Sequence, residues 1–245
     1  MLKSILVDRK SRIPRIWSNK ELRKFSSHFY GDIVNVSGWK DEDKEGQKYS
    51  SYFENKKSYT ITNYVSEARG FQGAENEIFI DLTNDLPSEH IQKYDVVFNH
   101  TVLEHIFEID KAFSNLCALT KDIAIVIVPF LQPMHADYGD FWRFTPLCLQ
   151  RLFEKNGMKV LYCSYNNPIN ASVYIFCIAT KNIEKWKDIL PSNIDEYGNV
   201  PFLCKAFLND GQTPMVGANA IINIGSFINL QLTTLRQKIK GFGKS

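Results

Sequence analysis

The sequence predicts an α/β fold built on a mostly parallel sheet, and three observations support this fold class. First, residues 94–129 read as a buried strand, a polar turn, an amphipathic helix and a second buried strand, an order typical of parallel sheets covered on both faces. Second, three further runs of β-forming residues precede this segment, at 32–37, 58–64 and 77–81. Third, residues 158–165 and 172–181 are two such runs joined without a helix, so we expect them to be antiparallel.

The N-terminal part of the chain contains the first helical signal. Residues Asn19–Phe29 place apolar side chains at roughly helical spacing, and Ser18 followed by Glu21 fits a capping box at the start of that helix. The segment leads directly into the first predicted strand. We therefore expect a helix packed beside the sheet.

Two more helices are expected in the central part of the chain. Leu103–Leu119 lies between the fourth and fifth predicted strands and has the pattern of an amphipathic helix. A later helix begins at Pro146, runs to about Asn156, and is ended by Gly157 as a C-terminal cap.

The C-terminal part divides from the rest by its weaker patterning. Residues 1–181 carry every predicted strand and are expected to form one domain. Residues 182–245 are expected to be an extension packed on that domain or on a partner. Within the extension we predict helices at Trp186–Leu190 and Ile221–Ile239.

Composition and charge limit the class of protein. The chain has 245 residues, of which 44% are hydrophobic and 23% charged, both ordinary for a soluble globular protein. Its 29 Lys and Arg nearly balance 27 Asp and Glu, giving a net charge of +2. This balance gives no electrostatic reason to expect nucleic acid or an anionic membrane as the main partner.

Cysteine use and the absence of targeting signals predict a cytoplasmic protein. The five cysteines show neither a CxxC pair nor metal-ligand spacing, and an odd, scattered set indicates a reducing compartment. Cys117, Cys163 and Cys177 fall in predicted helix or strand, where a buried thiol behaves as a small apolar group. The first residues lack the apolar core of a signal peptide, and no stretch is long enough to span a bilayer.

The order of elements carries a family resemblance. The segment YDVVFNHTVLEHI, the later IVIVPF, and the acidic Asp81 at the end of the third strand resemble the class I S-adenosylmethionine (SAM)-dependent methyltransferases. The resemblance covers about residues 30–181. It implies a Rossmann-like, seven-stranded, mostly parallel sheet with the last strand antiparallel and helices on both faces. It also implies SAM as the cofactor.

The resemblance assigns cofactor contacts to residues at the carboxyl ends of the first four strands, where ligands bind in open α/β sheets. These are Gly38, Asn63, Asp81, Leu82, Asn99 and His100. The last two begin the polar turn Asn99–His100–Thr101. By resemblance, Asp81 and the backbone of Leu82 read the adenine amino group, and Asn63 holds the ribose hydroxyls in place of the usual acidic residue.

Each assignment has a structural alternative. Gly38 is either a close-approach glycine or a simple turn residue, and Asn63 is either a ribose ligand or a turn-forming residue. Asp81 either binds the cofactor or caps the turn that follows it. His105 is better explained by helix packing than by ligand binding. The rest of the family's glycine motif is replaced by NVSGWKDEDKEG, so side chains of residues 39–49 are expected to supply contacts instead.

A loop after the fifth strand, HADYGDFWRFTP, concentrates acid, base and aromatic side chains. An unperturbed imidazole has a pKa of about 6.5, so His135 is the predicted general base, with Asp137 or Asp140 orienting it or binding sugar hydroxyls. Tyr138, Trp142 and Arg143 are the predicted substrate-binding residues. The alternative is an Asp140–Arg143 ion pair that only fixes the loop, with Trp142 in the core. A metal held by His135 and the two aspartates fits no known spacing, so no metal site is predicted.

The expected function is methyl transfer from SAM to a hydroxyl of a sugar or glycan precursor. The loop and NVSGWKDEDKEG are similar to methyltransferases of bacterial capsule and lipopolysaccharide biosynthesis, which implies a role in surface polysaccharide synthesis. The alternatives are a non-catalytic cofactor-binding or scaffold protein, and a methyltransferase for another small molecule. A nicotinamide-dependent oxidoreductase is disfavoured because GxGxxG is missing. Beyond the substrate, a second copy of the chain is the one protein partner considered.

Overall fold

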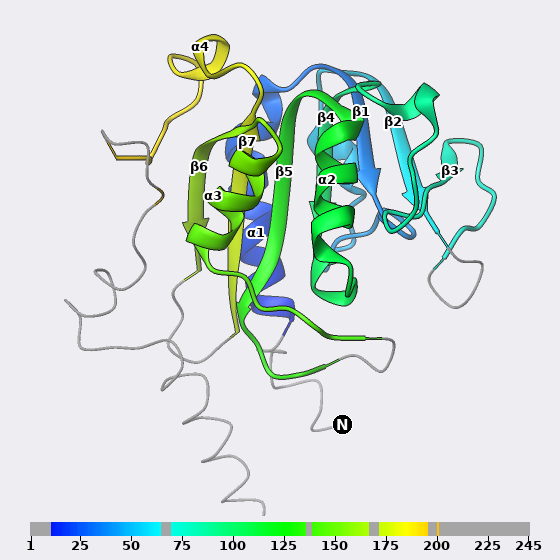
Figure 1. Cartoon of the computed structure of the whole chain (residues 1–245), viewed down its shortest axis with the longest axis horizontal. Coiled ribbons are helices and arrows are strands. Elements are labelled where there is room, and N and C mark those ends of the chain that lie inside the picture. The colour runs from blue at the N-terminus through cyan, green and yellow to red at the C-terminus, as the bar shows by residue number, and fades with distance from the viewer. Residues whose placement is uncertain (1–10, 65–69, 136–138, 167–171, 196–199, 201–245) are drawn as a thin grey trace, which may run out of the picture.

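The computed structural model describes residues 11–64, 70–135, 139–166, 172–195 and 200. These residues form one seven-stranded sheet in the order β3-β2-β1-β4-β5-β7-β6. Every strand pair except those made by β7 is parallel, and β7 is antiparallel to both β5 and β6. The predicted Rossmann-like fold is confirmed (Figure 1).

The seven strands lie close to the predicted runs. They are β1 (Gly31–Val36), β2 (Lys56–Asn63), β3 (Glu77–Phe79), β4 (Tyr94–His100), β5 (Thr120–Leu131), β6 (Lys159–Tyr165) and β7 (Val173–Thr180). The polar turn predicted at Asn99–His100–Thr101 is wrong in part, because the first two of these residues still belong to β4. Backbone pairing of Asn99 and His100 with β5 keeps them in the sheet, and the chain turns at Thr101, where φ is +53°.

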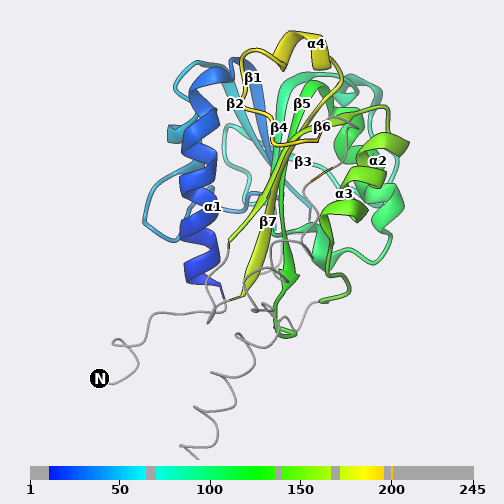
Figure 2. The same cartoon turned by 90° about the vertical axis from the view of Figure 1, so that its left-hand side faces the viewer.

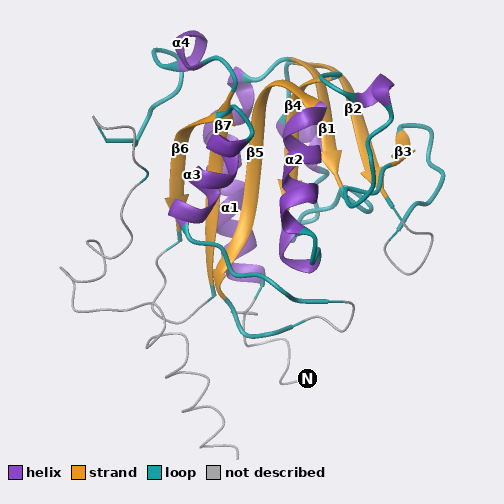
Figure 3. Cartoon of the chain, in the orientation of Figure 1, coloured by secondary structure: helices purple, strands orange, loops and turns teal. Residues whose placement is uncertain are grey.

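Helices cover both faces of the sheet, as Figures 2 and 3 show. One face carries α1 (Arg12–Phe25), the 3₁₀ turn η3 (Tyr49–Tyr52) and α4 (Ile183–Trp186), and the other carries α2 (Ile109–Leu119) and α3 (Pro146–Lys155). The side chains of β5 alternate between the two resulting cores, so its isoleucines face α1 while Ala124, Val126 and Val128 face α2 and α3. Cys117, Cys163 and Cys177 are buried, as predicted.

The first helix starts earlier than the sequence pattern indicated, and the predicted capping box is wrong. Ser18 lies within α1, where its hydroxyl donates to the carbonyl of Arg15 and contacts the His100 ring. The helix begins at Arg12 and tolerates Pro14 because proline fits a first helical turn.

The predicted helix Leu103–Leu119 is divided. Leu103–His105 forms a separate 3₁₀ turn, η5, and α2 begins only at Ile109. The carbonyls of Glu104 and Ile106 accept hydrogen bonds from the loop 139–142 instead of from a following helical turn. The break therefore results from tertiary contacts that local spacing does not reveal.

The helix predicted from Pro146 is confirmed. The side chain of Thr145 accepts a hydrogen bond from the backbone N–H of Cys148, Pro146 occupies the first turn, and Gly157 follows the helix with φ of +70°. The helix predicted at Trp186–Leu190 instead ends at Trp186, since α4 spans Ile183–Trp186. The predicted helix Ile221–Ile239 lies outside the described residues.

Within the part of the chain that the structure describes, none of the helices has the length and apolar character needed to cross a bilayer.

Candidate active site

The loop after β1 has an unusual backbone. Ser37, Trp39 and Asp41 all have positive φ, of 55°, 48° and 57°, a region that non-glycine residues rarely adopt and that concentrates at functional sites. A Cβ on Gly38 would lie 2.5 Å from Nδ2 of Asn35, so close packing demands a glycine there. The loop thus reaches left-handed conformations that a glycine-rich turn would adopt without cost.

Hydrogen bonds to Asp41 hold this backbone in place. Its carboxylate accepts from Asn35 Nδ2 at 2.8 Å, from the Tyr59 hydroxyl at 2.7 Å and from the Ser50 backbone N–H at 2.9 Å. Burial, with the negative charge of Asp41, raises the pKa of Tyr59 well above its ordinary value. Asp41 therefore shapes the loop and is not turned toward a ligand.

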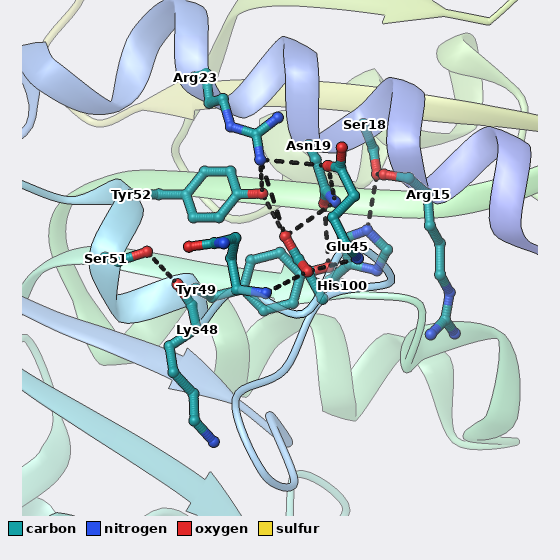
Figure 4. Close-up of polar contacts among 12 residues, drawn as sticks. Arg15, Ser18, Asn19, Arg23, Glu45, Lys48, Tyr49, Ser51, Tyr52 and His100 are labelled. Atoms are coloured by element: carbon teal, nitrogen blue, oxygen red, sulfur yellow. Dashed lines mark hydrogen bonds and ion pairs between the residues drawn. The ribbon is translucent and has the colours of Figure 1, made fainter.

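A second acidic residue of the loop ties it to α1, as Figure 4 shows. Asp43 accepts from the Tyr52 hydroxyl at 2.5 Å and from Asn19 Nδ2 at 3.2 Å. Arg23 of α1 lies over the Tyr52 ring, 4.6 Å from its centroid, and pairs with Glu45 at 3.2 Å. These contacts explain how a loop crowded with charges packs against a helix.

Asn63, the predicted ribose ligand, is engaged by the protein. It is buried, its Oδ1 accepts from Trp39 N–H at 2.8 Å, and its Nδ2 donates to the Trp39 carbonyl and to Glu77. Burial alone would raise the pKa of Glu77, but hydrogen bonds from Asn63 and from the backbone of Ala74 and Gln72 lower it. The Asn63 amide thus joins the β1 loop to β3, and its contact with ribose stays a prediction.

Asp81 and Leu82 follow β3. Asp81 Oδ1 accepts from both the backbone N–H and the hydroxyl of Thr83 at 2.8 Å, and Oδ2 accepts from Asn84 Nδ2 at 2.8 Å. This is the turn cap that the sequence offered as the alternative to cofactor binding. Leu82 is buried, and its carbonyl accepts from Asn115 of α2 at 2.8 Å.

Asn99 and His100 point to opposite faces of the sheet, since successive residues of a strand alternate. Asn99 is fully buried and its Nδ2 donates to the Val36 carbonyl at 3.1 Å, whereas its Oδ1 has no hydrogen-bond partner among the described residues. His100 instead contacts the Ser18 hydroxyl through Nε2 at 2.8 Å and lies beside the Tyr49 ring. The structure therefore leaves Asn99 at the junction of β1 and β4 and takes His100 under α1.

The electrostatic surroundings of His100 fit a neutral ring. Burial, with the nearby positive charge of Arg15, places the pKa of His100 well below its ordinary value. Arg15 itself donates to the Thr101 hydroxyl at 2.8 Å. Sequence reasoning missed this role of Arg15, because nothing in the local pattern of α1 indicates contact with the end of β4.

The two stretches singled out in the sequence, LEH and the loop after β5, are joined in the structure. The carbonyl of Glu104 accepts from the backbone N–H groups of Phe141 and Trp142 at 2.8 and 3.2 Å, and Nδ1 of His105 contacts the Gly139 carbonyl at 2.5 Å. Gly139 has φ of +116°, and a Cβ there would lie 2.7 Å from the Phe141 ring. A glycine is therefore required where the loop meets the turn.

The side chain of Glu104 is the second functional feature that sequence reasoning missed. It is fully buried, and neither carboxylate oxygen has a hydrogen-bond partner among the described residues. Burial raises the pKa of Glu104 to about 8, although Arg15 and Arg143 act in the opposite direction. The LEH motif marks this position, but its burial depends on a loop distant in sequence.

His135, Asp140 and Arg143 form one connected group. Nδ1 of His135 lies 3.1 Å from Asp140 Oδ2, and Arg143 binds both oxygens of Asp140 at 2.6 and 2.7 Å. Hydrogen bonding from Arg143 lowers the pKa of Asp140 to about 2. Both sequence interpretations of Asp140 are thus present in the geometry, as a partner of the histidine and as a loop-fixing ion pair.

Arg143 is bound mainly within its own loop. Besides Asp140, its guanidinium donates to the carbonyls of Gln132, Pro133 and Trp142. Its proposed contact with a substrate phosphate or carboxylate stays a prediction. Asp137 and Tyr138 lie outside the described residues.

Trp142 is only partly buried and is held in place from both ends. Its Nε1 donates to the Ile106 carbonyl at 2.9 Å, and its ring stacks on Phe107 with a centroid separation of 6.3 Å. Phe107 and Phe141 are 63% and 51% exposed. An apolar surface thus lies beside the polar group of His135 and Asp140.

Comparisons with known proteins support the fold. No family model matches the sequence, and no curated protein matches it. A candidate methyltransferase from Bacillus halodurans is 11% identical, with a TM-score of 0.50 and coverage of 66% of this chain and 97% of that one. At this identity the likeness shows a shared fold, the Rossmann-like fold of methyltransferases.

Two further structures give lower scores. A SAM-dependent methyltransferase from Clostridium acetobutylicum is 9% identical, covering 73% of this chain and 94% of its own, with a TM-score of 0.48. The magnesium protoporphyrin IX methyltransferase of Synechocystis with bound SAM is 11% identical, covering 69% and 79%, also at 0.48.

Proposed function

We propose that this protein is a SAM-dependent methyltransferase that acts on a hydroxyl of a sugar or glycan precursor in surface polysaccharide synthesis. The observation that carries the proposal is the strand order β3-β2-β1-β4-β5-β7-β6 with an antiparallel β7. The order reverses between β1 and β4, and ligands of open α/β sheets bind at the carboxyl edge beside such a reversal. The backbone of the β1 loop and the side chain of Asn99 lie at that place.

The donor side of the proposed site rests on two side chains with accepting capacity. The Oδ1 of Asn99 is a buried acceptor suited to the ammonium group or a ribose hydroxyl of SAM. A carboxylate offers about four lone-pair positions, and only three donors occupy those of Asp81. Asp81 therefore retains the capacity to accept from the adenine amino group.

The acceptor side of the proposed site is the group around His135. Methyl transfer is an in-line displacement, so the enzyme mainly positions the sulfonium and the acceptor oxygen. A general base adds about 10²–10⁴-fold for a hydroxyl acceptor. Asp140 orients the His135 ring through Nδ1, which directs Nε2 away as the proton acceptor. The exposed faces of Trp142 and Phe107 suit the apolar face of a sugar ring.

A second candidate function is a non-catalytic cofactor-binding or scaffold protein of the same fold. It is favoured by the engagement of Asn63 and Arg143 with the protein itself. It is also favoured by a β1 loop that lacks the family's glycines. The two candidates differ in turnover, whereas both predict cofactor binding.

Calorimetric titration of the purified chain with SAM, and separately with S-adenosylhomocysteine, tests the proposal directly. We expect saturable binding of both, and an Asn99→Leu variant should bind each at least about tenfold more weakly because a buried acceptor is lost. Methyl transfer from labelled SAM to a panel of nucleotide sugars and oligosaccharides then separates enzyme from scaffold. No binding of either compound by the folded wild-type chain would refute the proposal.

The role of His135 has its own test. His135→Ala is expected to lower turnover by about 10²-fold or more while leaving SAM affinity unchanged, because the residue lies on the acceptor side. His28→Ala, at an exposed histidine outside the site, serves as the matched control. An unchanged rate in His135→Ala would remove this residue from the reaction.

A further inference from the structure

Three side chains with metal-binding atoms meet beside the carboxyl ends of β4 and β5. Glu104 and His105 come from η5, and His135 comes from the loop after β5. One ligand atom of each lies within 4.8 Å of the other two. Oε1 of Glu104 and Nε2 of His105 are 3.7 Å apart, and the two imidazole centroids are 5.2 Å apart.

The Glu104 carboxylate supplies an observation independent of this clustering. It is fully buried, and among the described residues neither of its oxygens has a hydrogen-bond partner. The nearby guanidinium groups of Arg15 and Arg143 are bound elsewhere, to Thr101 and Asp140. A buried carboxylate without partners is costly, and a bound cation would satisfy it.

Both imidazoles are oriented as metal-bound histidines usually are. Such a histidine binds the metal through one ring nitrogen and donates the other N–H to a carbonyl or carboxylate. Nδ1 of His105 is held by the Gly139 carbonyl, and Nδ1 of His135 by Asp140. Nε2 is therefore the ligating nitrogen in each ring, and Gly139 and Asp140 act as positioning groups.

The ligand set indicates the kind of ion. Zn–N distances of about 2.0–2.1 Å place two tetrahedral ligands roughly 3.4 Å apart, close to the observed 3.7 Å between Glu104 and His105. Two imidazoles and one carboxylate suit first-row transition metals, whereas Mg²⁺ and Ca²⁺ prefer oxygen ligands. Three protein ligands also leave a coordination position for water or substrate.

We propose that Glu104, His105 and His135 bind a divalent first-row transition-metal ion that keeps at least one position open for an exogenous oxygen. The residue spacing did not reveal this site because its ligands come from two separate segments. A catalytic role for the ion rests on the proposed function. An acceptor hydroxyl bound there would lose its proton to water more readily, and its oxygen would form the new C–O bond as the C–S bond of SAM breaks. His135 would then hold the ion and not act as the base.

Cobalt titration of the full chain, purified without a histidine tag and stripped with a chelator, tests the site. We expect the visible absorption of Co²⁺ in a nitrogen- and oxygen-ligated site to appear and saturate at one equivalent, and Zn²⁺ to displace it. His135→Ala and Glu104→Gln should each weaken Co²⁺ binding by about 100-fold or more. Asp140→Asn should weaken it by about 10–100-fold, because it removes only a positioning group. His28→Ala should bind as the wild type does.

Outcomes for the metal site and for methyl transfer remain separable, because SAM binding is measured by calorimetry on the same preparations. Equal Co²⁺ affinity in the wild type and His135→Ala would overturn the metal site, whatever the result with SAM. Saturable Co²⁺ binding lost in His135→Ala, in a chain that does not bind SAM, would support the site and refute the proposed function. His135 is the most exposed of the three ligands, so its variant decides the matter even where Glu104→Gln fails to fold.

Discussion

Single residues in the β1 loop do the work that several glycines do in a glycine-rich turn. Asn35 is buried, lies against Gly38, and donates to Asp41, which in turn collects hydrogen bonds from Tyr59 and Ser50. These bonds offset the cost of three non-glycine residues with positive φ. The loop conformation therefore depends on one close contact between Gly38 and Asn35.

Replacing Gly38 tests that dependence. In Gly38→Ala the new methyl group would meet the Asn35 side chain at about the 2.5 Å separation of the ideal Cβ, and we expect a loss of about 1–3 kcal/mol in the free energy of unfolding. Urea denaturation measures this loss, and calorimetry should show weaker SAM binding. In an Asn35→Ala background the same substitution should cost less than half as much, because the colliding side chain is gone. Equal costs in both backgrounds would contradict the steric explanation.

At the scale of elements, local sequence patterns predicted the strands well and the turns around the site poorly. Strand runs such as 122–128 are continuous and β-branched, and burial on both faces leaves no competing interpretation. Leu103–Leu119 has helical spacing throughout, yet the carbonyls of its first residues bind the loop 139–142. Ser18 likewise fits a cap locally but is used by His100 across the sheet edge.

The candidate site shows the same division. Its position, at the carboxyl edge, follows from strand order and could be predicted, as could the importance of the His135 loop. The state of each side chain could not. Asn63 and Asp81 have the right chemistry for a ligand but bind Trp39 and Thr83. The burial of Glu104 depends on a loop that folds over it from a later part of the chain.

At the scale of the whole molecule, Asp122 joins the central sheet to the C-terminal segment. It accepts from Thr180 of β7 and from Lys185 Nζ and Trp186 Nε1 of α4, the latter two at 2.8 Å. Burial alone would raise the pKa of Asp122, but these hydrogen bonds and the charge of Lys185 lower it. The carboxylate is thus bound more favourably in the folded chain than in the unfolded one.

This lowered pKa predicts an acid-sensitive contribution to global stability. Because the folded-state pKa lies below the ordinary value of about 3.9, the contribution is fully present above that value and is lost as pH falls through the folded-state pKa. Asp122→Asn should lower the free energy of unfolding by about 1–2 kcal/mol at pH 7, a modest range because Lys185 is partly exposed. The difference from wild type should shrink toward zero in urea titrations carried below about pH 3. Asp188→Asn, at an exposed aspartate in the same segment, should change stability little at any pH, and a pH-independent deficit in Asp122→Asn would show that the lost contacts are not those of the charged form.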